Sequence, residues 1–531
     1  MRASLFAGAT VLLAVSCASS NEPKTVDRGS LRAVVLPDLS RLEDSVQVQL
    51  RERYAALTAK QKDPRVPAAD LGKEYGETGR LLMAAGFRDP AEASLLNAEA
   101  LAPGDMRWPY YLGHLYRERG DISKATVAFE RALRSAPDDA PTMIWLGEAA
   151  LDQGRTDVAE PLFAKALSVQ PRSAAAHYGL GRAALARKDY SPSVQHLEQA
   201  LALDGKASVI HYSLAMAYRG VGDQRQAESH LQQRGTLQIR PDLLRKELDE
   251  LLNSALTYER NADVAGARGE WAEAAEFLRK AVALAPTRAS PHHKLGTALF
   301  YLGDRRGSRE HFQEAVRLSP AFSQAHYALG VIHEEAGEHQ QAIESFSASV
   351  KAEPVYVDAR LGLANALRRS GQLAQSLSEY DRILRIDPGA VRARFGYAAA
   401  LIRLNRYQDA SDRLTEAMAL YPNDPSFARA AARLFSAAPD YRVRDGRRAV
   451  AIGQALLSQQ PRTLELVETL AMASAEVGQY DEAVQWQRQA IESAERAGRQ
   501  EAIPRLTDNL ARYQAGRPCR MPWRAGEAIE Y

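Results

Sequence analysis

Small residues recur along this chain at a fixed interval of 34 positions, within stretches whose larger apolar residues follow helical spacing. The first series is Gly79, Gly113, Gly147, Gly181 and Ala215, followed after a break by Ala262, Gly296, Gly330, Ala364 and Ala398. Twelve positions after each of these stands another small residue: Ala91, Ala125, Ala159, Ser193, Ala227, Ala274, Ser308, Ala342, Ser376 and Ala410. Such self-similarity predicts stacked units, because one unit alone cannot bury its apolar face.

A third series ends each unit with a residue that interrupts helices. It consists of Pro103, Pro137, Pro171, Pro286, Pro320, Pro354, Pro388 and Pro422, with Gly205 in one unit. Proline lacks a backbone N–H and disfavours helix in the residue before it. Two antiparallel helices approach closely only where side chains are small. Each unit is therefore predicted to be a pair of helices, and the whole chain to be all-α.

Large apolar residues fill the predicted seam between the two helices of a unit. Two consecutive units supply Leu112, Tyr116, Phe129 and Leu133, and then Leu146, Leu162, Phe163 and Leu167. The pattern resembles the tetratricopeptide repeat, whose consensus has an aromatic residue, Leu-Gly, Tyr, Ala, Phe, Ala and Pro at these offsets. The resemblance runs from residue 72 to 497. It implies a right-handed α-solenoid of about twelve helix pairs with capping helices at both ends, in which the first helices line the concave side.

Two interruptions break the period. The step from Ala215 to Ala262 is 47 residues, and the additional residues fall near 235–252. Charged residues around the leucines of this segment predict a lengthened amphipathic helix that divides the array, and a flexible hinge is the alternative. The second interruption, between residues 432 and 449, predicts a widened turn in a degenerate unit.

These features divide the sequence into seven segments. They are a signal peptide (1–16), a lipid-anchored tether (17–37), an N-terminal capping helix (38–71), a first repeat block (72–235), an insert (236–254), a second block with a degenerate repeat near 425–461 (255–497), and a C-terminal cap and tail (498–531).

The first residues are typical of an export signal. Arg2 precedes an apolar run from Leu5 to Val15 that is too short to span a bilayer. Residues 13–17 (LAVSC) resemble a bacterial lipobox, which implies lipidation of Cys17; Ala18 after it favours the outer membrane. The alternative is an ordinary cleaved secretory signal in which Cys17 is incidental. Either interpretation predicts a cell-envelope protein, periplasmic or attached to the outer membrane.

The amino-acid composition narrows the range of possible functions. Sixty-eight basic and 66 acidic residues leave a formal charge of +2, which argues against a general nucleic-acid binder. If Cys17 is acylated, Cys519 is the only remaining thiol and no intramolecular disulfide can form. Stability must then come from packing.

Candidate catalytic and metal-binding residues do not form a recognisable constellation. His177, His211, His292 and His326 share one repeat position, so their rings are expected about one helix pair apart, too far for shared ligation at about 2 Å. Residues 179–181 contain Gly-Leu-Gly, but no strand precedes them and no lysine-serine pair follows. No nucleophile elbow is present in the sequence. We therefore expect a protein that is not an enzyme and has neither cofactor nor metal.

Tyrosine and arginine recur on one stripe of the first helices. Helical geometry separates this stripe from the positions that face the second helix. The candidate binding residues are Arg80, Tyr110, Arg117, Tyr178, Arg182, Tyr212, Arg219, His293, Tyr327 and Phe395. Both residue types dominate binding hot spots, so the stripe predicts a groove for an acidic peptide or a helix with an acidic face. The alternative is that the tyrosines pack between adjacent first helices and the arginines are only solvated.

The resemblance implies a non-catalytic function in protein–protein interaction. The interpretation that we favour is a scaffold or adaptor of the cell envelope, anchored to a membrane by its lipid, with other proteins and no nucleic acid as partners. A chaperone-like holder of envelope clients and a regulatory subunit of a separate enzyme are the alternatives.

Overall fold

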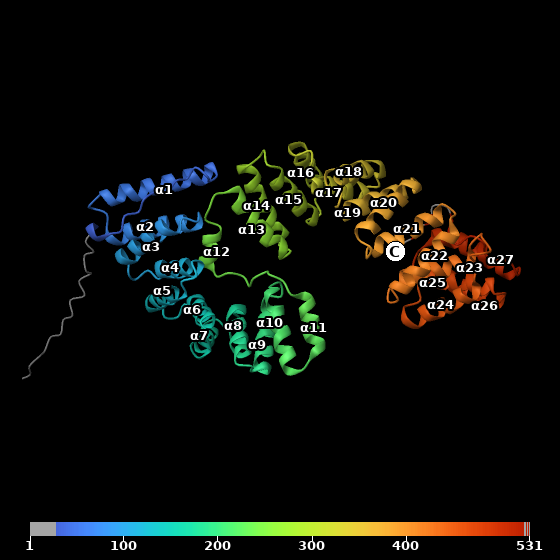
Figure 1. The fold of residues 1–531 in the computed structure, drawn as a ribbon, viewed down its shortest axis with the longest axis horizontal. Helices are drawn as coiled ribbons and strands as arrows, with labels where there is room; N and C mark the ends of the chain where they lie inside the picture. The colour runs from blue at the N-terminus through green and yellow to red at the C-terminus, as the bar shows by residue number, and fades with distance from the viewer. Residues whose placement is uncertain (1–27, 525–526, 528, 530–531) are drawn as a thin grey trace, which may run out of the picture. The chain divides into compact units, whose positions relative to one another are not determined.

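The computed structural model describes residues 28–524, 527 and 529 (Figure 1). Within them the chain forms 27 α-helices and two short 3-10 helices, Arg28–Ser30 (η1) and Gln500–Ala502 (η2), and no strand. The predicted all-α repeat fold is confirmed. The predicted signal peptide and Cys17 lie outside the described residues. No helix in the described part of the chain is long and apolar enough to cross a membrane.

The helices belong to two compact units, Met1–Ala285 and Pro286–Tyr531. In the first unit, α1 (Asp44–Lys62) packs against the first of six helix pairs, and α12 (Leu243–Asp249) stands outside the pairs. The pairs are α2 (Ala68–Ala84) with α3 (Arg88–Leu101), α4 (Arg107–Glu118) with α5 (Ile122–Ser135), α6 (Ala140–Asp152) with α7 (Thr156–Val169), α8 (Ala174–Ala186) with α9 (Tyr190–Leu203), α10 (Val209–Val221) with α11 (Gln224–Gln233), and α13 (Ala255–Ala267) with α14 (Trp271–Leu284).

The second unit holds six further pairs, which brings the total in the described residues to the expected twelve. They are α15 (Ala289–Tyr301) with α16 (Arg305–Leu318), α17 (Ser323–Glu335) with α18 (His339–Ala352), α19 (Val357–Arg369) with α20 (Leu373–Ile386), α21 (Val391–Arg403) with α22 (Tyr407–Leu420), α23 (Pro425–Ala437) with α24 (Gly446–Gln459), and α25 (Leu464–Glu476) with α26 (Tyr480–Arg496). The closing helix, α27 (Ile503–Gln514), packs on α26.

Glycines of the first helices make room for aromatic rings of the second helices. A Cβ atom on Gly113 would lie 2.5 Å from the Phe129 ring, and one on Gly147 would lie 2.7 Å from Phe163. Both rings are fully buried. The series of small residues in the sequence is therefore the consequence of one close contact that every unit repeats.

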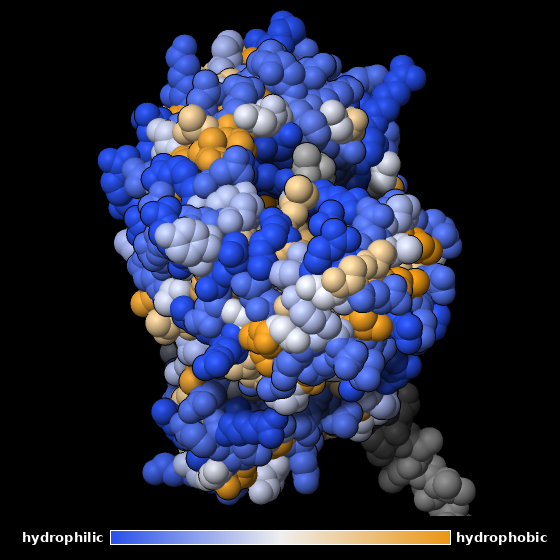
Figure 2. Space-filling model, turned by 90° about the vertical axis from the view of Figure 1, so that its right-hand side faces the viewer, coloured by the Kyte–Doolittle hydropathy of each residue, from blue (hydrophilic) through white to orange (hydrophobic). Residues whose placement is uncertain are grey.

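Many large apolar side chains are buried in these contacts between helices. The face seen in Figure 2 is mainly hydrophilic, with hydrophobic residues in small separate groups. Such groups are ordinary for a soluble surface. Stability thus comes from the internal seams, where alanine, leucine and phenylalanine predominate.

The insert does not lengthen a helix, so that prediction is wrong. Helix α11 ends at Gln233, residues 234–242 are without helix, and α12 is a separate helix of seven residues. Pro241 disfavours helix before it, and the Asp242 side chain caps α12 by accepting the N–H of Arg245 at 3.0 Å.

The boundary between the two units lies between Ala285 and Pro286, one helix pair after the insert. The Glu43 carboxylate, just before α1, accepts the N–H groups of Ala255 and Leu256 at 2.8 and 3.3 Å. These hydrogen bonds attach the start of α13 to the first unit, so the insert does not separate the units. The widened turn predicted in the degenerate repeat joins α23 to α24, where Asp445 donates its N–H to Phe435 O at 3.0 Å.

Candidate binding surface on the first helices

The stripe of the first helices that carries the candidate binding residues, from Arg80 to Phe395, is called the first-helix surface below. In the first unit, part of it is covered by α12, which Figure 1 shows beside α4. The Tyr110 hydroxyl donates to the Asp242 carboxylate at 2.7 Å, and Trp145 Nε1 donates to the same carboxylate at 2.8 Å. Burial, and secondly the charge of Asp242, raise the pKa of Tyr110 well above its ordinary value. Tyr110 therefore stays a neutral hydrogen-bond donor.

Further contacts hold α12 in place. Arg80 bridges Glu77 at 3.0 Å and Glu247 of α12 at 3.3 Å. In a second ion pair α12 supplies the cation: Arg245 of α12 pairs with Glu118 at 2.9 Å. The insert therefore lies on the first-helix surface as a short helix that presents two carboxylates to tyrosine, tryptophan and arginine.

Three of the predicted binding residues are consequently engaged within the chain. Tyr110 and Arg80 are buried, and both contact the insert. Arg117 pairs with Asp152 at 3.0 Å and lies 5.0 Å from the Trp145 ring centroid. In the described structure, the first three helix pairs thus offer few of their predicted residues to an outside partner.

Helices α8 and α10 carry the part of the predicted surface that stays accessible in the first unit. Tyr212 is 56% exposed, and Arg219 is exposed without an ion pair in the described residues. Arg182 pairs with Glu148 and lies 5.5 Å from the centroid of half-buried Tyr178. These four side chains lie on two neighbouring first helices.

In the second unit, the predicted aromatic residues pack within the repeats. His293 lies 4.9 Å from Phe322 and 5.5 Å from Phe312, measured between ring centroids. Tyr327 lies 5.3 Å from Tyr356, and Phe395 is 4% exposed. These contacts correspond to the alternative that was left open for this stripe, in which the rings pack between neighbouring helices.

Burial of His293 gives the second unit an acid-sensitive position. Desolvation, and secondly the charge of Lys294, lower the pKa of His293 from 6.5 to about 4. Because folding favours the neutral ring, the contribution of the neutral His293 ring to stability is complete above about pH 6.5 and is lost as the pH falls to about 4, by up to about 3 kcal/mol.

We expect His293→Phe to lose less thermal stability than the wild type between pH 7 and pH 4. A comparison at pH 8 controls for altered packing, and equal losses in the two proteins would contradict the assignment.

Histidine pairs recur within single repeats, and the sequence analysis missed them. In each pair a first-helix histidine meets one from the second helix, with Nδ1 atoms 3.2, 2.9 and 3.1 Å apart: His177 with His196, His211 with His230, and His292 with His311. A spacing of 19 residues joins the two histidines of each pair, and the first-helix position alone does not reveal it. No group of three or more His, Cys, Asp or Glu residues in the described part of the chain is placed to hold a metal ion.

The C-terminal tail lies on the first helices of the second unit, which the sequence did not predict. Arg433 of α23 donates to Pro522 O at 2.5 Å and pairs with Glu527 at 2.7 Å. Its guanidinium lies 5.5 Å from the Trp523 ring centroid. On the other side, Arg433 pairs with Glu468 at 3.1 Å. Cys519 in the tail is a free, buried thiol.

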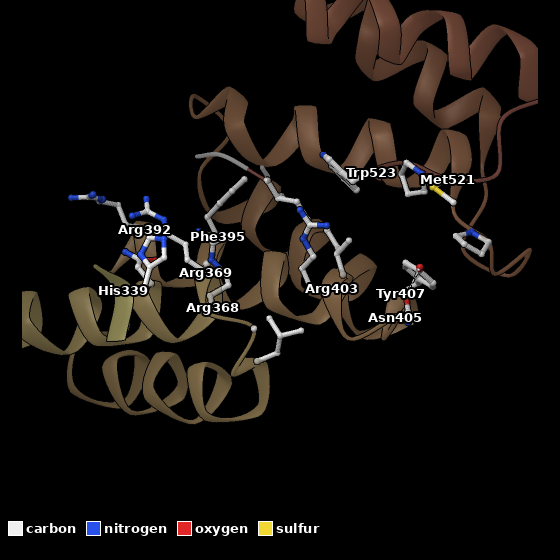
Figure 3. A pocket seen from close by; sticks show the side chains of 18 residues that line it. His339, Arg368, Arg369, Arg392, Phe395, Arg403, Asn405, Tyr407, Met521 and Trp523 are labelled. Carbon is white, nitrogen blue, oxygen red and sulfur yellow. Dashed lines mark hydrogen bonds between the residues drawn. The ribbon is translucent and has the colours of Figure 1, made fainter. Parts of the chain in front are cut away.

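A pocket of about 950 Å³ opens between α19, α21 and this tail (Figure 3). Arg368 and Arg369 come from α19, Arg392 and Arg403 from α21, and Trp523 from the tail. In Figure 3, Arg369, Arg392 and His339 lie at one end of the pocket, and Met521, Asn405 and Tyr407 at the other. The pocket is therefore lined by cationic, polar and aromatic side chains, and none of the described residues in its wall is Asp or Glu.

Models of known protein families match the repeats of this chain. Tetratricopeptide repeat models match residues 77–140, 146–208, 293–357 and 337–391, and further models of the same repeat match 208–233, 367–434 and 463–497. Together these matches span more than half of the chain. The protein belongs to the tetratricopeptide repeat family, whose members generally mediate protein–protein interaction.

Solved structures match parts of the chain. A tetratricopeptide repeat protein from Parabacteroides merdae is 16% identical, with a TM-score of 0.37 over 49% of this chain and 98% of that one. MamA is 19% identical, with a TM-score of 0.21 over 39% of this chain and 95% of that one. YrrB, described as having an unusual peptide-binding site, is 16% identical, with a TM-score of 0.23 over 44% and 95%. No curated protein matches.

Proposed function

We propose that this protein is a non-catalytic scaffold or adaptor of the bacterial cell envelope, which holds segments of partner proteins on its first-helix surface. The observation that carries the proposal is the contact between α12 and the first helices. There, a short helix is already bound through Asp242 and Glu247 to tyrosine, tryptophan and arginine side chains. A segment of another protein with similar chemistry can be held in the same manner.

The accessible continuation of this surface on α8 and α10 is the proposed contact region in the first unit. Tyr212 and Arg219 project there without a partner for the Arg219 charge in the described residues. Tyrosine buries a large area at low entropic cost, and arginine offers planar donors to carboxylates. An acidic peptide, or a helix with an acidic face, fits this region.

The proposed location rests on the N-terminal sequence. Lipidation of Cys17 would attach the repeats to a membrane surface, and the envelope assignment follows from the export signal. Mass spectrometry of the purified mature N-terminus tests this point, because an acylated Cys17 and an unmodified terminus differ by the mass of the lipid.

The binding function is tested by replacing Tyr178, Arg182, Tyr212 and Arg219 together with alanine. We expect at least a tenfold loss of partner capture from envelope membranes, since hot-spot residues contribute on the order of 1–2 kcal/mol each. Capture is measured by crosslinking and quantitative mass spectrometry of the purified complexes.

The matched control replaces Arg134 and Arg225, exposed arginines of second helices, with alanine. Unchanged capture by a folded quadruple variant would remove α8 and α10 from consideration. A defined set of partners supports the adaptor, whereas a heterogeneous mixture of unfolded clients would favour a chaperone-like holder.

A further inference from the structure

The pocket between α19, α21 and the tail contains arginines that form no ion pair in the described chain. Arg369 pairs with Glu334, but Arg368, Arg392 and Arg403 form no ion pair in the described residues. Arg403 donates only to a carbonyl, Arg524 O, at 3.0 Å. By contrast, Arg360, which lies on the same helix as Arg368, forms an ion pair with Glu379.

Donors in the pocket wall are also left without acceptors. The Nε–H of Arg368 is buried and has no hydrogen-bond partner among the described residues. Asn365 accepts the Tyr380 hydroxyl through Oδ1 at 2.6 Å, which leaves its amide N–H groups available. A buried donor without an acceptor costs about 1–3 kcal/mol. An anion with several acceptor atoms can accept hydrogen bonds from these donors.

The positive groups also act on one another. Burial, and secondly the charge of Arg368, lower the pKa of Arg403, while Glu527 opposes this effect. The electrostatic effect of Arg368 on Arg403 is repulsive, and both side chains line the pocket. A carboxylate between them would replace repulsion with two charge-assisted contacts, because the planar guanidinium fork matches carboxylate oxygens.

Two segments of the chain demonstrate which groups the first helices accept. In the first unit, α12 supplies Asp242 to Tyr110 and Trp145, and Glu247 to Arg80. In the second unit, the tail supplies Glu527 to Arg433 at 2.7 Å. In each case the bound group is a carboxylate on a peptide segment. The Arg368–Arg403 pocket has the same chemistry, but no described carboxylate enters it.

We propose that this pocket binds an acidic segment of a partner protein, with one carboxylate held between Arg368 and Arg403. Trp523 and Phe395 in the wall would contact the apolar part of the segment, and exposed Arg392 would attract it electrostatically. The volume of about 950 Å³ accommodates a few side chains, not a folded domain. This assignment rests on the proposed protein-binding function and specifies the chemistry of the partner for the second unit.

The test uses the full-length chain and a fluorescein-labelled peptide that contains two Asp, two Glu and flanking Leu residues. We expect the double variant Arg368→Gln and Arg403→Gln to bind this peptide at least tenfold more weakly than the wild type in fluorescence anisotropy. The same peptide with Asn and Gln should bind the wild type at least tenfold more weakly. Affinity should fall with added NaCl, since the contact is ionic.

The control variant carries Arg306→Gln and Arg385→Gln, which remove the same charge from exposed second-helix positions. It should bind the acidic peptide as the wild type does. Because Arg368 and Arg403 have no ion pair to lose, the pocket variant should keep its melting temperature, which separates loss of binding from loss of fold.

Three results would overturn the assignment: no binding of the acidic peptide to the wild type, equal binding by the pocket variant, or equal binding of the neutral peptide. Competition by inorganic phosphate at the peptide's own concentration would instead identify a site for small free anions. Loss of partner capture in the α8–α10 variant together with unchanged peptide binding in the pocket variant rejects the pocket alone. If neither variant loses partner capture, the proposed function fails as well.

Discussion

Glu468→Ala is expected to destabilise the C-terminal part of the second unit by about 3–5 kcal/mol, because it breaks a buried ion-pair network. The Glu468 side chain is 1% exposed and pairs with Arg433 at 3.1 Å and with Arg505 of α27. After the substitution, buried Arg433 and partly buried Arg505 retain Glu527 as their ion-pair partner in the described residues, at 2.7 and 3.7 Å. One carboxylate then serves two guanidinium groups, and the positive charge left unbalanced in a low-dielectric interior carries a large desolvation cost.

Hydrogen exchange of α23 to α27 measures this effect, because repeat arrays open locally and need not unfold as one unit. The matched control is Glu465→Ala on the same helix, whose side chain is 52% exposed and pairs with Arg499. An exposed pair contributes less than about 1 kcal/mol. Similar exchange rates in the two variants would contradict the buried network as a source of stability.

Phe163→Ala should weaken the first unit by about 3–5 kcal/mol, the range for loss of a fully buried aromatic side chain. The ring fills the space above Gly147 of its own pair and also contacts Gly179 of the next pair. Its removal therefore leaves a cavity at the interface between α6, α7 and α8, which those glycines cannot fill.

Thermal unfolding and hydrogen exchange of α6 to α9 report the loss. Val169→Ala is the control, since Val169 lies on α7 but is 42% exposed, and surface changes usually stay within about 0.5 kcal/mol. Equal melting temperatures for the two variants would show that the α7 seam does not depend on the ring.

Sequence alone predicted the repeating part of this fold because its causes are local. Gly113 is small because Phe129 packs on it 16 residues later, and the same relation returns in the following unit. Proline at the end of each unit acts on its immediate neighbour. Period, helix pairs and capping helices could therefore be predicted without knowledge of any long-range contact.

The segments that cover the first helices could not be predicted in this way. The hydrogen bond between Tyr110 and Asp242 joins residues 132 positions apart, and the Arg433–Glu527 contact joins residues 94 apart. In sequence, Asp242 resembles an ordinary helix cap, which it also is. The candidate residues on α8 and α10 were predicted from the repeat register, whereas the Arg368–Arg403 pocket depends on a tail that has no repeat pattern.

The position of α12 also imposes a threshold on competing ligands. Because the insert is covalently linked to the helices that it covers, its local concentration there is on the order of millimolar, as for short flexible linkers. A free peptide competes with this tethered segment, and its apparent dissociation constant increases by the inverse of the fraction of time for which the insert is detached. Weak acidic peptides at low concentration are thus excluded from α2 and α4, and only a ligand of high intrinsic affinity, high concentration or high multiplicity displaces the insert.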